Sequence, residues 1–258
     1  MKVVTFTITI LLMNLSFSHG QELPPKAFAL YPTLGEMYGF AVGKYRDQVL
    51  IFGGMIKSDV PELSNADFPN HEIILIDLGR NRVSAYGSGN LDGVLSDQMS
   101  ATGLAYYQKD NMLYIVGGYG YSDEQERFIT FPYMTVIDLE ATVSAITAGK
   151  NPVAFFYQIN DERLAVFNAV MDYNGQEFFL INGTYAYKLR PFDNEPYYEE
   201  IDRTGEAHTF RVEGVGEDLN LQNFRSWYDV NDLRDYYGSL LPPRIEQEAE
   251  KALQKKIH

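Results

Sequence analysis

Hydrophobic runs along this chain end in a pair of glycines, and this combination recurs at a nearly constant distance. The first copy spans residues 49–54 (VLIFGG), and the second, residues 113–118 (LYIVGG), follows 64 residues later. A third copy, residues 178–183 (FFLING), follows after another 65 residues and has Asn182 in place of the first glycine. Self-similarity at a fixed spacing predicts a repeat architecture, in which each unit buries its apolar face against its neighbours.

Each copy has the pattern of a β-hairpin. Residues 37–54 align without gaps on residues 101–118, and both stretches contain two apolar segments joined by a short polar turn. The third copy has Asn174-Gly175 at the same turn, which is the strongest hairpin dipeptide. Glycines at strand ends permit a positive φ and a close approach of a neighbouring backbone. The structural repeat glycines predicted in this way are Gly39, Gly53, Gly54, Gly103, Gly117, Gly118 and Gly183.

Two more strands are expected after each hairpin. The third strands have near-continuous apolar character, which indicates burial on both faces. The expected third and fourth strands are residues 72–78 and 82–86 in the first unit, 134–139 and 143–146 in the second, and 207–213 and 219–225 in the third. Residues 198–201 are an alternative for the first strand of the last pair. The pattern predicts an all-β fold with about three four-stranded antiparallel units.

These residues resemble the kelch-type β-propeller family, whose repeat has a hydrophobic strand ending in Gly-Gly and then a strand of the Ile-Asp-Leu kind. The resemblance covers residues 28–245, and residues 99–121 with 129–133 look like a group of secreted bacterial propellers. One departure is that Trp227, the only tryptophan, leaves the first two copies without the tryptophan often found late in a kelch unit. The resemblance implies a propeller domain over residues 21–245, with blades at 28–87, 99–147 and 164–225 and a partial blade, one strand at 236–245.

The expected ring is incomplete. A closed propeller has four to eight blades, but residues 246–258 form a charged, strongly helix-forming tail where further strands would belong. One explanation is truncation relative to a longer ancestor, which we favour. The other is that the chain closes by pairing with itself or with a partner, since open blade edges promote self-association.

The N-terminus has the pattern of a secretory signal. Met1 and Lys2 precede an apolar run that ends at Phe17, and small residues stand at Ser18 and Gly20. This predicts a cleaved signal peptide over residues 1–20 and a secreted or periplasmic protein. A buried strand and a membrane anchor are the alternatives, and no later segment is apolar enough to cross a bilayer.

The amino-acid composition limits which reactions, metal ligands and partners are expected. The absence of cysteine excludes disulfides, thiol nucleophiles and thiolate metal ligands, so stability must come from packing, to which 19 Tyr and 16 Phe are suited. The net charge of −14 argues against nucleic acid and anionic membranes as partners. The resemblance includes copper-radical oxidases, whose cross-linked cysteine this chain lacks.

Long connections are expected on one face, because the loops after second and fourth strands emerge together in an up-and-down meander. Loops gathered on a rigid scaffold are a common place for ligand contact. Tyrosines beside carboxylates and an arginine can bind sugars or peptides, although each carboxylate could equally be solvated surface. The candidate ligand-binding residues are Glu62, Asp97, Tyr119, Tyr121 and Arg127.

Motifs for catalysis are scarce, and no metal-ligand spacing, phosphate loop or dinucleotide fingerprint occurs. We therefore expect no catalytic residues, metal or cofactor, and a non-catalytic binding protein whose long-loop face contacts a glycan or a protein. The alternatives are a sugar mutarotase or epimerase, as some exported kelch propellers resemble, and a non-functional fragment.

Overall fold

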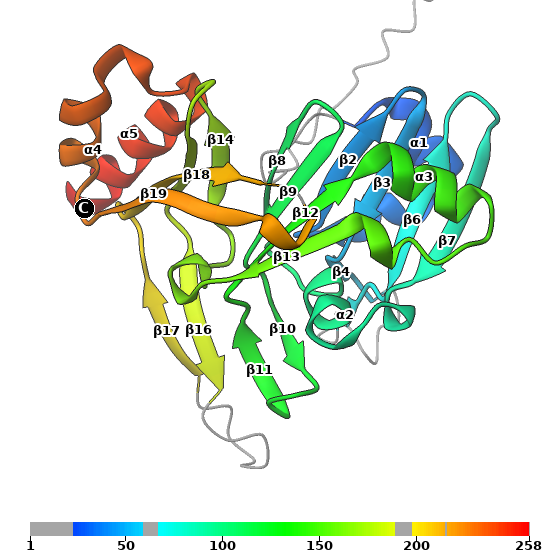
Figure 1. Cartoon of the computed structure of the whole chain (residues 1–258). Helices are drawn as coiled ribbons and strands as arrows, with labels where there is room; N and C mark the ends of the chain where they lie inside the picture. Colours follow the sequence, from blue (N-terminus) through cyan, green and yellow to red (C-terminus); the bar gives the residue numbers. More distant parts are fainter. Residues whose placement is uncertain (1–22, 59–66, 189–197, 215, 258) are drawn as a thin grey trace, which may run out of the picture.

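Three four-stranded antiparallel sheets, each a meander, follow one another along the chain in this computed structural model (Figure 1), which describes residues 23–58, 67–188, 198–214 and 216–257. The first sheet contains β2 (Ala41–Tyr45), β3 (Gln48–Phe52), β6 (Glu72–Asp77) and β7 (Arg82–Gly87). The second contains β8 (Ala105–Lys109), β9 (Met112–Val116), β12 (Tyr133–Asp138) and β13 (Phe156–Asn160). The third contains β14 (Val170–Tyr173), β15 (Phe178–Ile181), β18 (Ala207–Glu213) and β19 (Asn220–Trp227). The expected signal peptide, residues 1–20, lies outside the described residues.

The three sheets stack because their central strands are apolar on both faces. In β9, Leu113 and Ile115 belong to the buried cluster shared with the first sheet. Tyr114 and Val116, which alternate with them, belong to the cluster shared with the third sheet. Successive strand residues point to opposite faces, so one strand contributes to two cores. This explains the near-continuous hydrophobic runs in the sequence.

The repeat glycines all have positive φ, as the sequence predicts, and the first glycine of each pair adjoins the next sheet. A Cβ on Gly53 would lie 2.3 Å from the carbonyl oxygen of Ala101, and a Cβ on Gly117 would lie 1.8 Å from that of Val166. Asn182, at the third copy, has the same backbone conformation (φ 61°), and its side chain contacts α5 (Pro243–Ile257) instead of another sheet. A side chain is therefore tolerated only where no sheet follows.

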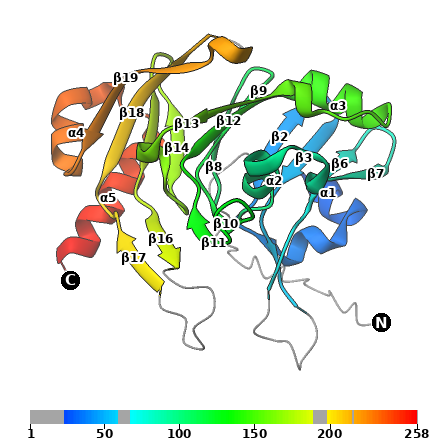
Figure 2. The ribbon, with the colours of Figure 1, turned by 60° about the horizontal axis from the view of Figure 1, so that its bottom comes forward.

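Helices cover both ends of the stack. At one end, α1 (Pro25–Leu30) contributes Ala27 to the buried cluster of the first sheet. At the other end, α4 (Val230–Tyr237) and α5 cover the outer face of the third sheet (Figures 1 and 2). The short C-terminal helix is confirmed, but the extra strand expected at residues 236–245 is wrong. Asp229 caps α4, and Val230, Leu233 and Tyr237 lie at helical spacing and are buried.

The fourth strand of the second sheet also differs from the prediction. Residues 143–146 lie in α3 (Leu139–Thr147), and the strand is β13, beyond the expected blade boundary at residue 147. The Asp138 carboxylate accepts the backbone N–H of Ala141 at 3.0 Å and starts the helix where a turn was expected. A local cap therefore outweighs the strand preference of Val143 and Ile146.

The long second-to-third-strand loops contain strands of their own. Strands of the second and third loops form a four-stranded sheet in the order β10-β11-β16-β17, and the first loop adds a small sheet with β1. Residues 198–201, the alternative for the third unit, lie in β17, so the preferred pair of strands is confirmed. The strands are β1 (Met37–Tyr38), β4 (Met55–Ile56), β5 (Phe68–Pro69), β10 (Tyr119–Ser122), β11 (Arg127–Thr130), β16 (Thr184–Lys188) and β17 (Tyr198–Asp202). Within the described residues no sheet closes into a ring, and no helix is long and apolar enough to span a membrane.

Candidate functional site

The loop strands meet along one side of the sheet stack, below the three main sheets in Figure 1. Ile129 of β11 pairs with Tyr187 of β16, which joins the hairpin of the second sheet to that of the third. The buried hydroxyl of Thr130 strengthens this junction, because it donates to the carbonyl of Ala186 and accepts the Ala186 N–H, both at 2.8 Å. The hairpin end, defined here as β1, β4, β5, β10, β11, β16 and β17, is therefore partly a continuous sheet.

Aromatic rings concentrate on β10 and β11. Tyr119 stacks on Phe128 at 5.9 Å between ring centroids and lies 5.3 Å from Phe167. Tyr121 meets Phe128 edge-to-face at 5.4 Å. Tyr121 is 44 % exposed and Phe128 39 %, so this cluster presents apolar ring surface to water. Rigid, amphipathic rings of this kind bind sugar faces and peptide side chains.

The exposed apolar surface is unevenly distributed over the molecule. Of the eight exposed large hydrophobic side chains among the described residues, five lie on the hairpin end. These five are Tyr38, Phe68, Tyr121, Phe128 and Ile201. Exposed apolar groups that gather at one place indicate an interaction surface more than scattered ones do.

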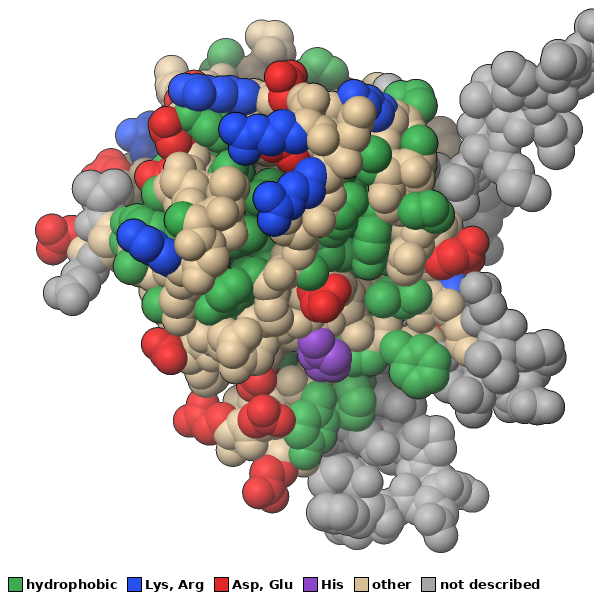
Figure 3. Space-filling model, turned by 90° about the vertical axis from the view of Figure 1, so that its right-hand side faces the viewer, with side chains coloured by type: hydrophobic (Ala, Val, Ile, Leu, Met, Phe, Trp, Pro, Cys, Tyr) green, Lys and Arg blue, Asp and Glu red, His purple; other side chains and the backbone are tan. Residues whose placement is uncertain are grey.

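Charged side chains are also unevenly distributed over the surface. On the face shown in Figure 3, most Lys and Arg side chains lie toward the end opposite the hairpins, while acidic and hydrophobic side chains extend to the hairpin end. A ligand at the hairpin end therefore meets little positive charge from this face. This favours a neutral glycan or an uncharged or basic peptide over an anionic ligand.

Asp97, one of the predicted site residues, contacts the turn of the β10–β11 hairpin. It lies in α2 (Gly93–Met99), and its carboxylate accepts the backbone N–H of Asp123 at 3.0 Å. Burial raises the pKa of Asp97, and the charge of Asp123 acts in the same direction. This hydrogen bond joins the turn of the β10–β11 hairpin to α2.

Tyr119, Tyr121 and Arg127 lie on the β10–β11 hairpin, whose turn Asp97 contacts. The Arg127 guanidinium donates to the Gln125 side chain at 2.7 and 3.1 Å, which holds it along the hairpin turn. The structure places Tyr119, Tyr121 and Arg127 on one hairpin, with Asp97 at its turn, but not on one face: Tyr121 pairs with Phe128, whereas Arg127 pairs with Ser122 and lies on the opposite face. Glu62 lies outside the described residues. Sequence analysis missed Phe128, the ring that both tyrosines contact; its alternation with Arg127 and Ile129 in a Tyr-flanked hairpin is the signal that identifies it.

Another carboxylate of the hairpin end is held by a tyrosine. The Tyr38 hydroxyl donates to Asp67 at 2.5 Å, and burial together with this carboxylate raises the pKa of Tyr38 to about 12. A phenol with so high a pKa remains a hydrogen-bond donor at neutral pH. Among the described residues no group of three His, Asp or Glu side chains is placed to hold a metal ion.

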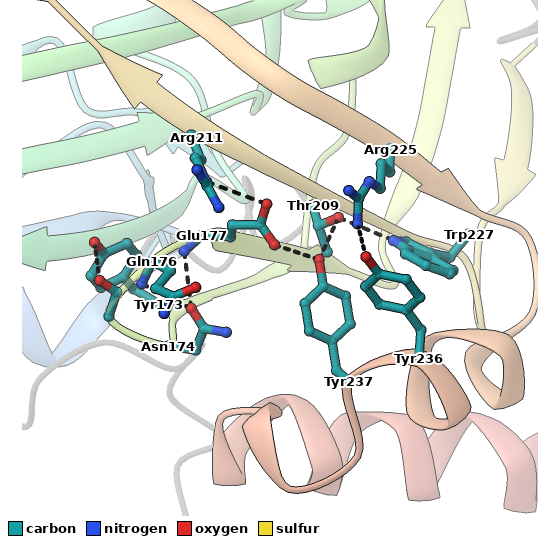
Figure 4. Close-up of polar contacts among 11 residues, drawn as sticks. Tyr173, Asn174, Gln176, Glu177, Thr209, Arg211, Arg225, Trp227, Tyr236 and Tyr237 are labelled. Carbon is teal, nitrogen blue, oxygen red and sulfur yellow. Dashed lines mark hydrogen bonds and ion pairs between the residues drawn. The ribbon is translucent and has the colours of Figure 1, made fainter.

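A second polar cluster, which sequence analysis did not predict, lies between the third sheet and α4 (Figure 4). Tyr237 donates to the buried carboxylate of Glu177 at 2.6 Å, and Arg211 lies 3.5 Å from the other oxygen of Glu177. Thr209 accepts the indole N–H of Trp227 at 3.1 Å. Because Tyr237 of α4 donates to Glu177 and lies 3.2 Å from Thr209 of β18, the cluster attaches α4 to the third sheet.

No protein-family model matches the chain, and no curated protein matches it significantly.

Proposed function

We propose that this protein is an exported, non-catalytic binding protein whose hairpin end contacts a neutral glycan or a protein segment. The observation that carries the proposal is the exposed ring cluster of β10 and β11, in which Phe128 contacts both Tyr119 and Tyr121. The three sheets beneath supply a rigid support, as folded scaffolds do for binding loops. Export rests on the signal-like pattern of residues 1–20.

The three stacked sheets are, in the same proposal, kelch-type propeller blades. Support comes from the strand order within each sheet and from the glycine pairs at Gly53-Gly54 and Gly117-Gly118, which occupy equivalent places against the next sheet. The backbone N–H of Gly54 donates to Ala101 and that of Gly118 to Val166, at 2.8 and 2.9 Å. The same contact thus recurs at both sheet junctions.

A mutarotase or epimerase activity has less support. Such an enzyme needs an acid–base pair facing one substrate, and three of the described carboxylates at this end, Asp67, Asp97 and Asp202, accept hydrogen bonds from the protein itself. The observations favour recognition by stacking over proton transfer.

The binding proposal is tested on glycan and peptide arrays with the purified protein. The double change Tyr121→Ala and Phe128→Ala removes the most exposed stacking pair and should weaken binding at least about tenfold, because stacked aromatic contacts contribute roughly 1–3 kcal/mol at such surfaces. Tyr228→Ala is the matched control, since Tyr228 is 77 % exposed on the connection to α4. It should bind like the wild type.

Two results would contradict the proposal. One is silence on both arrays; the other is unchanged binding by the double variant. If the protein instead accelerates anomer exchange of a free sugar, followed by NMR, the enzyme alternative takes its place.

A further inference from the structure

Asparagine replaces glycine at two equivalent positions of the third repeat, Asn168 and Asn182. The aligned glycines of the first two copies are Gly39 and Gly103 for the first position and Gly53 and Gly117 for the second. All of these residues have a positive φ, between 57° and 69°. Asparagine is one of the few residues besides glycine that adopt this conformation readily. The backbone is therefore alike in the three repeats, and the third repeat differs by two polar side chains.

The glycines are required where another sheet follows. A Cβ on Gly39 would lie 2.6 Å from the backbone nitrogen of Gly103, and a Cβ on Gly103 would lie 3.0 Å from that of Asn168. The third sheet is followed by α5 instead, which runs beside the β16–β17 hairpin (Figure 2). Asn168 and Asn182 both line a groove of about 510 Å³ between α5 and the base of this hairpin, the α5 groove. An open polar groove therefore stands where the first two sheets contact the next repeat.

The charges that line the α5 groove cancel. Two carboxylates and two ammonium groups line it, and they pair with one another. Lys255 lies 2.9 Å from Asp202, and Lys251 lies 2.6 Å from Glu248. Hydrogen bonds from Thr204 and Lys255 lower the pKa of Asp202 to about 2, so this pair stays charged at neutral pH. Because the lining has no net charge, it favours a neutral ligand over an anion or a cation.

Hydrogen-bonding capacity remains in the groove after these pairs form. An ammonium group has three N–H donors, and Lys251 uses one of them on Glu248. The Asn168 side chain is exposed and makes no hydrogen bond within the described part of the chain, so its amide offers donors and an acceptor. A sugar hydroxyl both donates and accepts, so it matches a carboxylate and an ammonium group held side by side.

We propose that the α5 groove binds a neutral monosaccharide. Its volume falls within the range of small-molecule sites, about 300–1,000 Å³. Of the side chains that the structure describes, no aromatic one lines the groove, so the ligand is held by hydrogen bonds and not by stacking. The groove is thus a second site, different in chemistry from the hairpin end, and it does not rest on the function proposed for that end.

A titration followed by heteronuclear NMR detects weak binding and also locates it. The neutral probes are glucose, galactose, mannose and N-acetylglucosamine, and the charged probes are glucuronate and glucosamine. At least one neutral sugar should shift the backbone amides of Gly183, Thr204 and Lys251, which line the groove, and the shifts should saturate. The charged sugars, at the same ionic strength, should bind no more tightly than the neutral ones.

Asn168→Gly removes the side-chain amide and restores the residue that the first two copies have, so it introduces no backbone strain. The affinity for the neutral sugar should fall about threefold to tenfold, as for the loss of about one hydrogen bond. The matched control is Asn81→Gly, on the turn between β6 and β7, because Asn81 is also exposed and has a φ of 52°. This control should bind like the wild type.

The two proposed sites are separated by the variant of the hairpin end. Tyr121→Ala with Phe128→Ala should leave the titration of the α5 groove unchanged. The inference is overturned if no neutral sugar shifts the groove amides at high millimolar concentration, or if Asn168→Gly binds as tightly as the wild type. Shifts confined to residues 119–130 would place sugar binding at the hairpin end alone, and tighter binding of a charged sugar would contradict the ligand class.

Discussion

At the residue scale, the repeat glycines show two separate constraints, on backbone conformation and on space. Gly117 has a φ of 67°, which disfavours any other residue, and it also lies against the carbonyl of Val166. Gly149 has nearly the same φ, 66°, but nothing lies within 4 Å of the place where its Cβ would be. The two positions therefore separate the cost of conformation from the cost of a clash.

Gly149→Ala should destabilise the protein by about 1 kcal/mol, the cost of left-handed backbone for a residue with a side chain. Gly117→Ala should cost at least about 2 kcal/mol more, because the second and third sheets must move apart. Urea unfolding of both variants measures the difference. Equal losses would mean that the close approach at Gly117 does not hold the sheets together.

His208 on β18 gives the fold a dependence on pH. Burial, with the charges of Arg203 and Arg163, lowers its pKa to about 4 from an ordinary 6.5, against the opposing charge of Asp161. The unfolded chain thus takes up a proton more readily than the folded protein does. Stability is full above pH 6.5 and is lost as the pH falls toward 4, by up to roughly 3 kcal/mol.

His208→Gln should flatten the fall in unfolding free energy between pH 6.5 and pH 4. His71→Gln is the control, since His71 is exposed, and it should follow the wild-type curve. A wild-type curve without that fall, or one that His208→Gln leaves unchanged, would show that the imidazole is not held neutral.

At the element scale, the sequence predicts the elements that follow from local alternation and turn residues. It misses elements at which a helix cap or a tertiary contact competes with local strand preference. The hairpins, their turns and the preferred strand pair of the third sheet follow from alternation and turn residues. The helix α3 was missed because the cap at Asp138 competes with β-branched residues that favour strands. The family resemblance predicts a strand at residues 236–245, where the structure has the end of α4, a turn and the start of α5. The helical spacing of Val230, Leu233 and Tyr237 is the signal that the resemblance obscures. Of the candidate site, the sequence indicates Tyr119 and Tyr121 in a long loop but not the hairpin that this loop forms. The pairing of that hairpin with β16 depends on contacts 56 residues apart along the chain.

Thr130→Val tests that pairing. It removes both hydrogen bonds to Ala186 and leaves a buried N–H without its partner, which should cost about 1–3 kcal/mol. The loss should be local: amide exchange should accelerate in β11 and β16 and stay slow in β3 and β9. The control is Thr147→Val, at an exposed position of α3, which should change neither the stability nor the exchange rates. If amide exchange accelerates equally in all sheets, the pairing of β11 with β16 is not a local anchor of the hairpin end.

At the scale of the whole molecule, the sheets and helices are arranged in order along one direction. Sheets succeed one another along the stack, helices cover its two ends, and hairpins gather at one side of it (Figures 1 and 2). The buried clusters divide in the same way, one around the first sheet, one between the second and third, and one beneath α4 and α5. Rigid support and exposed rings therefore occupy different parts of the chain, so a change in one can be tested without loss of the other.

The most direct measurement of the proposed function is an amide-exchange footprint of the protein with the best ligand from the arrays. The account predicts slower exchange in the peptides that cover residues 119–130, with the paired strand β16 as the next most protected. Slowing confined to α4 and α5, with residues 119–130 exchanging as in the free protein, would contradict it.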